Sequence, residues 1–121
     1  MILLVEDEET LLLAVSKMLQ KKGYPVLEAA NGDLAVDLLH RYRADVALIL
    51  LDVNLPGRSS REVLDEARRI GGSQVPVILT SAFSQNLIGS SFDGMKIDHF
   101  IRKPYRLAAI VELVQNFLAA S

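Results

Sequence analysis

The chain has 121 residues, of which 50% are hydrophobic, and its 13 basic and 15 acidic side chains give a formal net charge of −2. This composition is sufficient for one compact domain with a continuous apolar core, and we expect residues 1–121 to form a single domain. The charge argues against a nucleic-acid-binding surface, and the absence of cysteine excludes disulfides and thiolate metal sites. No apolar run reaches the roughly 20 residues that span a bilayer, and acids follow the first short apolar run, so we expect a cytoplasmic protein without membrane contact.

The first part of the chain predicts a strand, a helix and a second strand. Residues 2–5 form an apolar run, and apolar residues then recur at helical spacing over 11–19. Lys21-Lys22-Gly23 is a cationic last turn followed by a glycine, which is typical of a helix end. Residues 25–29 are expected to form the second strand.

The next segment predicts a capped helix and a buried strand. Asn31-Gly32-Asp33 is a turn whose first residue can cap a helix. Residues 46–52 are the most apolar stretch of the chain and end in an aspartate, so we expect the third strand there. The inward side chains of the helix are predicted to be Leu34, Leu38 and Leu39.

A capping box marks the start of the third helix, because Ser59 stands three residues before Glu62. Gly71-Gly72 ends this helix, and residues 75–81 predict the fourth strand, with a proline near its start. The side chains that this helix is expected to bury are Val63, Leu64 and Ala67.

The last part of the chain predicts a weak helix, a fifth strand and a clear final helix. Residues 84–96 have a glycine-diluted apolar face, which indicates a short or mobile fourth helix. Residues 99–102 read as the fifth strand. One stripe of the final helix contains Leu107, Ile110, Val111, Val114, Phe117 and Leu118.

This alternation predicts an α/β fold with a doubly wound five-stranded parallel sheet, flavodoxin-like, in the strand order 2-1-3-4-5, with helices on both faces. In that order the first and third strands are neighbours, so Glu6, Asp7 and Asp52 converge at one edge of the sheet. Ser81 and Lys103 arrive there from the fourth and fifth strands. Such an edge is where folds of this type bind ligands.

Three adjacent carboxylates repel one another unless a cation is present, and Mg²⁺, or Mn²⁺ in its place, suits oxygen ligands of this kind. We assign Asp7 and Asp52 as direct metal ligands, the backbone carbonyl of Asn54 as a third, and Glu6 as a contact through water. Asp52 is also placed to attack a phosphoryl group. Metal and Lys103 would neutralise the phosphoryl oxygens, and the Ser81 hydroxyl would donate to one of them.

Taken together, these positions resemble the receiver domain of two-component response regulators, from Ile2 to about Leu118. Glu6-Asp7 resembles the acidic pair of that family, and Asp52-Val53-Asn54-Leu55-Pro56-Gly57 its phosphoacceptor loop. Ser81-Ala82 resembles its small hydroxyl pair, and Lys103-Pro104-Tyr105 its lysine-proline-aromatic motif.

The resemblance implies that Asp52 is phosphorylated from a histidine of a partner kinase or phosphotransfer protein, with small phosphodonors as further possible substrates. It implies a cis Lys103-Pro104 bond, a switch aromatic at Phe100 that responds to Ser81, and tuning of dephosphorylation by Asn54 and Phe83. Residues 100–105 look like receivers attached to hybrid sensor kinases.

The chain departs from the family in two places. Ser59-Ser60 stands where the family usually has an aspartate-glycine pair, and Lys96-Ile97 where it favours glycine-alanine before the switch aromatic. The bulky Phe83 is expected to limit access of the attacking water, which would lengthen the lifetime of the phosphoryl group.

Two alternatives stay open from the residues alone. One is an interaction module of the same fold that is never phosphorylated. The other is a phosphohydrolase with an aspartyl nucleophile, although such haloacid-dehalogenase-like enzymes need a second aspartate where this chain has Asn54. A flavin or nucleotide site is weaker still, because the first strand-helix turn has no phosphate-binding loop. We therefore expect a switch that catalyses its own modification and not an enzyme, and we predict no oligomeric state.

Overall fold

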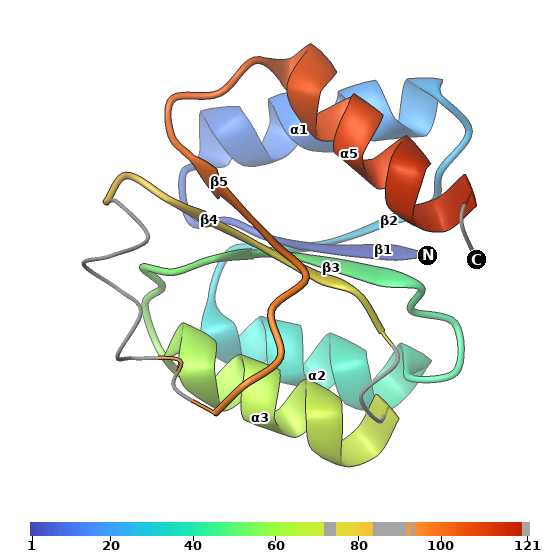
Figure 1. Cartoon of the computed structure of the whole chain (residues 1–121). Helices are drawn as coiled ribbons and strands as arrows, with labels where there is room; N and C mark the ends of the chain where they lie inside the picture. The colour runs from blue at the N-terminus through green and yellow to red at the C-terminus, as the bar shows by residue number, and fades with distance from the viewer. Residues whose placement is uncertain (72–74, 84–91, 93, 120–121) are drawn as a thin grey trace.

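The computed structural model describes residues 1–71, 75–83, 92 and 94–119. It contains one sheet of five parallel strands (Figure 1). The order of these strands is β2-β1-β3-β4-β5, as the alternation of strands and helices predicted. Their bounds are β1 (Ile2–Val5), β2 (Val26–Ala29), β3 (Leu48–Asp52), β4 (Val77–Ser81) and β5 (His99–Arg102).

Helices cover both faces of the sheet (Figure 1). Helices α1 and α5 lie together on one face, and α2 and α3 lie on the other. The fourth helix expected within 84–96 falls mainly on residues outside the described part of the chain. The bounds of the described helices are α1 (Glu9–Lys21), α2 (Gly32–Tyr42), α3 (Ser60–Gly71) and α5 (Leu107–Ala119). None of these helices is long and apolar enough to cross a membrane.

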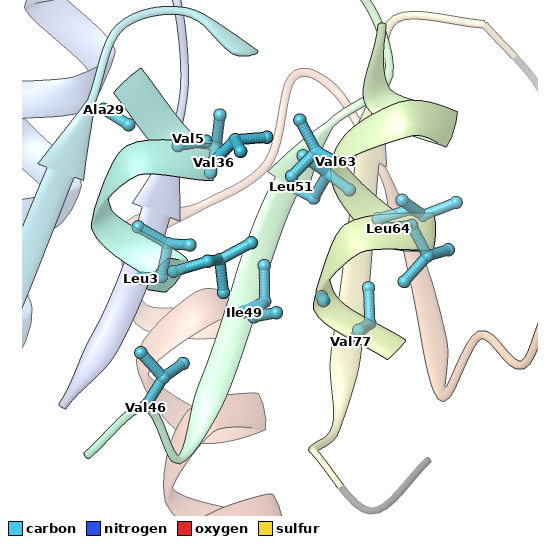
Figure 2. Packing of buried hydrophobic residues seen from close by; sticks show 14 of the residues in the cluster. Leu3, Val5, Ala29, Val36, Val46, Ile49, Leu51, Val63, Leu64 and Val77 are labelled. Carbon is cyan, nitrogen blue, oxygen red and sulfur yellow. The ribbon is translucent and has the colours of Figure 1, made fainter. Parts of the chain in front are cut away.

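Two apolar clusters lie on opposite faces of the sheet, because successive strand side chains point to opposite sides. In β3, Leu48 and Leu50 pack toward α1 and α5, whereas Ile49 and Leu51 pack toward α2 and α3. Figure 2 shows the cluster on the α2–α3 face, in which Leu51 lies against side chains of α2 and α3. With both faces covered, all five residues of β3 are buried. Asp52 is therefore buried because it is the last residue of this covered strand.

Local signals set the starts of two helices as predicted. The Glu62 N–H donates to Ser59 Oγ at 3.2 Å, and the Ser59 N–H donates to Glu62 Oε1 at 3.4 Å, so the capping box is formed. The Leu34 N–H donates to Asn31 Oδ1 at 2.8 Å. These two caps end the loops that follow β3 and β2.

The inward face predicted for α2 was partly wrong. Leu34 is 40% exposed, whereas Leu39 is buried as expected. The buried residues of this helix include Ala35 and Val36, which share one face with Leu39 at helical spacing, and Leu34 lies outside that stripe. Leu34 is therefore exposed because the buried stripe of α2 runs through Ala35, Val36 and Leu39.

Candidate functional site

Three acids meet where β1 and β3 end. Val5 pairs with Leu51 in the sheet, so Glu6 and Asp7 leave β1 beside Asp52. Carboxylate oxygens of the three residues all lie within 4.8 Å of one another. Glu6 and Asp52 are buried, and Asp7 is exposed. Clustered hard oxygen donors with one open side are the ligand set that Mg²⁺ prefers, so the residues present fit this ion.

Lys103 reaches into the acidic cluster from the segment after β5. Its Nζ lies 2.6 Å from Glu6 Oε1 and 3.1 Å from Asp52 Oδ2. Its backbone N–H donates to the Ser81 carbonyl at 2.7 Å, and the following peptide bond to Pro104 is cis, as the resemblance implied. The contact with Asp52 was expected, whereas the closer contact with Glu6 was not foreseen.

The charges of these groups depend on one another. Burial raises the pKa of Asp52 to about 7, with a further rise from the neighbouring Glu6, against the opposing effects of the Asn54 N–H and Lys103. Burial by itself lowers the pKa of Lys103, but Glu6 and Asp52 outweigh it, so the pKa is raised overall. Lys103 is therefore cationic at neutral pH. An added cation would favour the ionised form of Asp52.

The loop after Asp52 is tied to three parts of the site. The Asn54 N–H donates to Asp52 Oδ1 at 3.1 Å, and the Val53 N–H donates to the Thr80 carbonyl at 2.9 Å. The buried Ser60 hydroxyl shares its single proton between the carbonyls of Asp52 and Val53. The sequence reasoning missed this role of Ser60 because it assigned the serine pair only to helix capping.

Ser81 lies at the same edge of the sheet, because it ends β4 one residue after Thr80, the partner of Asp52 in register. Its side chain is buried, and its Oγ accepts the N–H of Phe83 at 3.0 Å. The side chain of Phe83 itself is 51% exposed. Phe100 lies one strand further along, where it pairs with Leu79 and packs against the α2–α3 side of the core.

The site opens to solvent beside Tyr105. This side chain is partly buried against the α1–α5 side of the core, and burial followed by the charge of Glu6 raises its pKa to about 12. It borders a hollow of about 320 Å³, which gives access to Lys103 from outside. The hollow is lined by Glu8, Leu11, Ala82, Lys103, Pro104 and Tyr105.

Comparison with known proteins agrees with this geometry. The family model of the response regulator receiver domain matches residues 2–115. The chain belongs to this family. Receiver domains are signalling modules of two-component systems with a phosphoacceptor role, and they interact with histidine kinases or phosphotransfer proteins.

Two curated relatives differ in length. Sporulation initiation phosphotransferase F of Bacillus subtilis (strain 168) is 30% identical over 117 residues, which cover 97% of this receiver domain and 92% of the relative. Sensory transduction protein RegX3 of Mycobacterium tuberculosis (strain ATCC 25618 / H37Rv) is 30% identical over 119 residues. That match covers 97% of this chain but 50% of RegX3, so the receiver domain spans about half the length of that protein.

Solved receivers of kinases share the fold. The receiver domain of the hybrid histidine kinase CckA is 30% identical, with a TM-score of 0.79 and 97% of each chain covered. The receiver of the sensor histidine kinase PA1611 from Pseudomonas aeruginosa PAO1 is 28% identical, with a TM-score of 0.82, and covers 98% of this chain and 96% of its own. That structure has a magnesium ion coordinated in its active-site cleft.

Proposed function

We propose that this receiver domain is a Mg²⁺-dependent switch in which Asp52 accepts a phosphoryl group from the phosphohistidine of a histidine kinase or histidine phosphotransfer protein. The environment of Asp52 is the main support for this proposal. It is a buried carboxylate at a strand end, with a lysine Nζ at 3.1 Å and two further acids within ligand distance of one cation. Such a setting is costly for stability, and it suits phosphoryl transfer.

The metal would be held by Asp7, Asp52 and the backbone carbonyl of Asn54, with Glu6 acting through water. Mg²⁺, or Mn²⁺ in its place, would neutralise charge on the phosphoryl oxygens. The coordinated ion in the PA1611 receiver supports this assignment, as does the fit of the three carboxylates.

In the transfer, an Asp52 oxygen forms a bond to phosphorus while the N–P bond of the phosphohistidine breaks. The electron pair of that bond returns to the imidazole of the donor. Lys103 stabilises the negative charge of the phosphoryl oxygens during this displacement. The domain thereby catalyses its own modification without turnover of an external substrate, and a small phosphodonor such as acetyl phosphate can replace the histidine.

The conformational output follows from Ser81 and Phe100. The Ser81 hydroxyl accepts a hydrogen bond from the Phe83 N–H, and a hydroxyl that accepts one bond can also donate its proton, here to a phosphoryl oxygen. Such a bond would pull the segment after β4 inward, and Phe100 on the neighbouring strand would change rotamer in response. The CckA and PA1611 receivers, which belong to sensor kinases, support the proposal that this domain resembles receivers attached to hybrid sensor kinases.

Intact-protein mass spectrometry after incubation with Mg²⁺ and acetyl phosphate tests the proposal. The parent protein should gain one phosphoryl group, and Asp52→Asn should gain none. Asp65→Asn, which changes an exposed acid of α3, is the matched control and should behave as the parent. Phosphorylation of Asp52→Asn, or a parent protein that stays unmodified, would contradict the assignment.

A further inference from the structure

The hydroxyl of Ser60 is a buried polar group that no step of the proposed transfer uses. Ser60 is the first residue of α3 and is 2% exposed. Its Oγ donates to the carbonyl of Asp52, and it lies 2.6 Å from the carbonyl of Val53. The hydroxyl therefore bridges the two carbonyls that directly follow the side chain of the phosphoacceptor.

Each of these carbonyls belongs to a planar peptide unit whose N–H is also engaged. The Val53 carbonyl shares its peptide plane with the Asn54 N–H, which donates to Asp52 Oδ1 at 3.1 Å. The Asp52 carbonyl shares its plane with the Val53 N–H, which donates to Thr80 at 2.9 Å. A rotation of either plane would break hydrogen bonds at both of its ends, so Ser60 controls the orientation of the group that holds the carboxylate.

The far end of the same loop is held by α2. The Gly32 N–H donates to the Pro56 carbonyl at 3.1 Å, and a Cβ atom at Gly32 would lie 1.9 Å from the Arg58 carbonyl oxygen. The backbone of the loop is therefore in direct contact with the start of α2. Of the two attachments, the one through Ser60 is adjacent to Asp52.

We propose that Ser60 is a positioning residue for phosphoryl transfer, whose hydroxyl fixes the two peptide planes after Asp52 and thereby the direction of the acceptor carboxylate. The inference rests on the proposed function of Asp52. Without the hydroxyl, the Asn54 peptide turns away from Oδ1, and the attacking carboxylate samples unproductive directions. A misplacement of this kind slows attack even when metal and phosphodonor are saturating.

Ser59 and Ser60 offer a matched pair of variants. Ser59→Ala removes a hydroxyl that contacts the capping partner Glu62, whereas Ser60→Ala removes the hydroxyl that contacts Asp52 and Val53. At saturating Mg²⁺ and acetyl phosphate, we expect the maximal phosphorylation rate to fall about tenfold in Ser60→Ala and less than about twofold in Ser59→Ala. Ser60→Gly, which also lacks the hydroxyl, should match Ser60→Ala. Thermal unfolding of each variant reports any loss of stability separately.

A maximal rate in Ser60→Ala or Ser60→Gly equal to that of the parent would overturn the inference, as would an equal loss in Ser59→Ala. Failure of the parent to take up a phosphoryl group would instead refute the proposed function. Amide hydrogen exchange gives a readout that needs no phosphodonor. The Asn54 N–H should be protected in the parent and in Ser59→Ala, and it should exchange faster in Ser60→Ala. An unprotected Asn54 N–H in the parent would also overturn the inference, whether or not the variants fold.

Discussion

At the scale of single residues, the site is organised around one lysine that two buried acids share. The Nζ of Lys103 is closer to Glu6 than to Asp52, at 2.6 Å against 3.1 Å. Burial raises the pKa of Asp52 to about 7, and the neighbouring Glu6 adds to the rise, because one ammonium group cannot fully compensate two buried carboxylates. The same two acids raise the pKa of Lys103 against the opposing effect of burial. A further cation would therefore reduce the repulsion between the two carboxylates.

The raised pKa of Asp52 predicts a pH-dependent stability of the metal-free protein. The ordinary pKa of this group is 3.8, so between that value and about 7 the folded state binds a proton that the unfolded state has lost. The stabilising contribution is complete at low pH and disappears as the pH rises through 7. We expect the free energy of unfolding to fall by about 2 kcal/mol from about pH 5 to about pH 8 because of Asp52.

Urea denaturation in the presence of a chelator measures this change. Asp52→Asn removes the titrating group, so its free energy of unfolding should fall less over the same pH range. Equal pH dependence in the parent and in Asp52→Asn would show that Asp52 titrates near its ordinary pKa.

We expect Phe83 to affect the lifetime of the phosphoryl group on Asp52. Its backbone N–H donates to Ser81 Oγ at 3.0 Å, and 51% of the residue is exposed. An apolar side chain there offers no hydrogen bond to an attacking water, whereas a carboxylate does. We expect Phe83→Glu to shorten the lifetime severalfold, measured as loss of the phosphorylated mass over time. Phe83→Leu, which is also bulky and apolar, should stay near the parent, and a longer lifetime in Phe83→Glu would refute the idea that Phe83 limits the attack of water.

At the scale of elements, the start of α2 is a support for the loop between β3 and α3. Close approach of Gly32 to the Arg58 carbonyl leaves no room for a side chain. Gly57 is in the left-handed region with φ 77°, and a Cβ on it would meet Asp33, so this loop passes tightly over the first turn of α2. The loop that follows the proposed phosphoacceptor is thus shaped by α2, whose first residue, Gly32, lies more than 20 residues before Arg58 in sequence.

Gly32→Ala should therefore disturb the site from a distance. We expect a loss of about 1 to 3 kcal/mol in the free energy of unfolding, because backbone atoms must shift, together with slower phosphorylation by acetyl phosphate. Asp33→Ala is the neighbouring control. It removes an exposed ion pair with Arg58 at 3.3 Å, which is worth less than about 1 kcal/mol. The explanation fails if Gly32→Ala is as stable and as active as Asp33→Ala.

At the scale of the whole molecule, the site exists only when the sheet is assembled. Its groups follow four different strands, with the acids after β1 and at the end of β3, Ser81 at the end of β4 and Lys103 after β5. Parallel strands place these ends on one edge, which is the general position of ligand sites in such sheets. Binding at this edge is therefore coupled to folding.

Mg²⁺ should stabilise the folded protein through this coupling. At a concentration of about 100 times Kd, the free energy of unfolding should rise by about 2.7 kcal/mol, measured by urea denaturation at constant ionic strength. Asp7→Asn removes a proposed ligand and should abolish most of the increase. Glu9→Gln, an exposed acid in the first turn of α1, should retain it. A parent protein whose stability is independent of Mg²⁺ would contradict the metal assignment.

The strand order, two helix caps and the set of residues at the carboxyl edge of the sheet could all be predicted from the amino-acid sequence. These features depend on local periodicity, on capping chemistry and on the rule that parallel strands end together. Three features could be seen only in the folded chain: the exposure of Leu34, the contact of Lys103 with Glu6 and the contact of Ser60 with the backbone of Asp52. Each of these depends on how closely elements distant in sequence approach one another, and such distances arise from packing and leave no periodic mark in the chain.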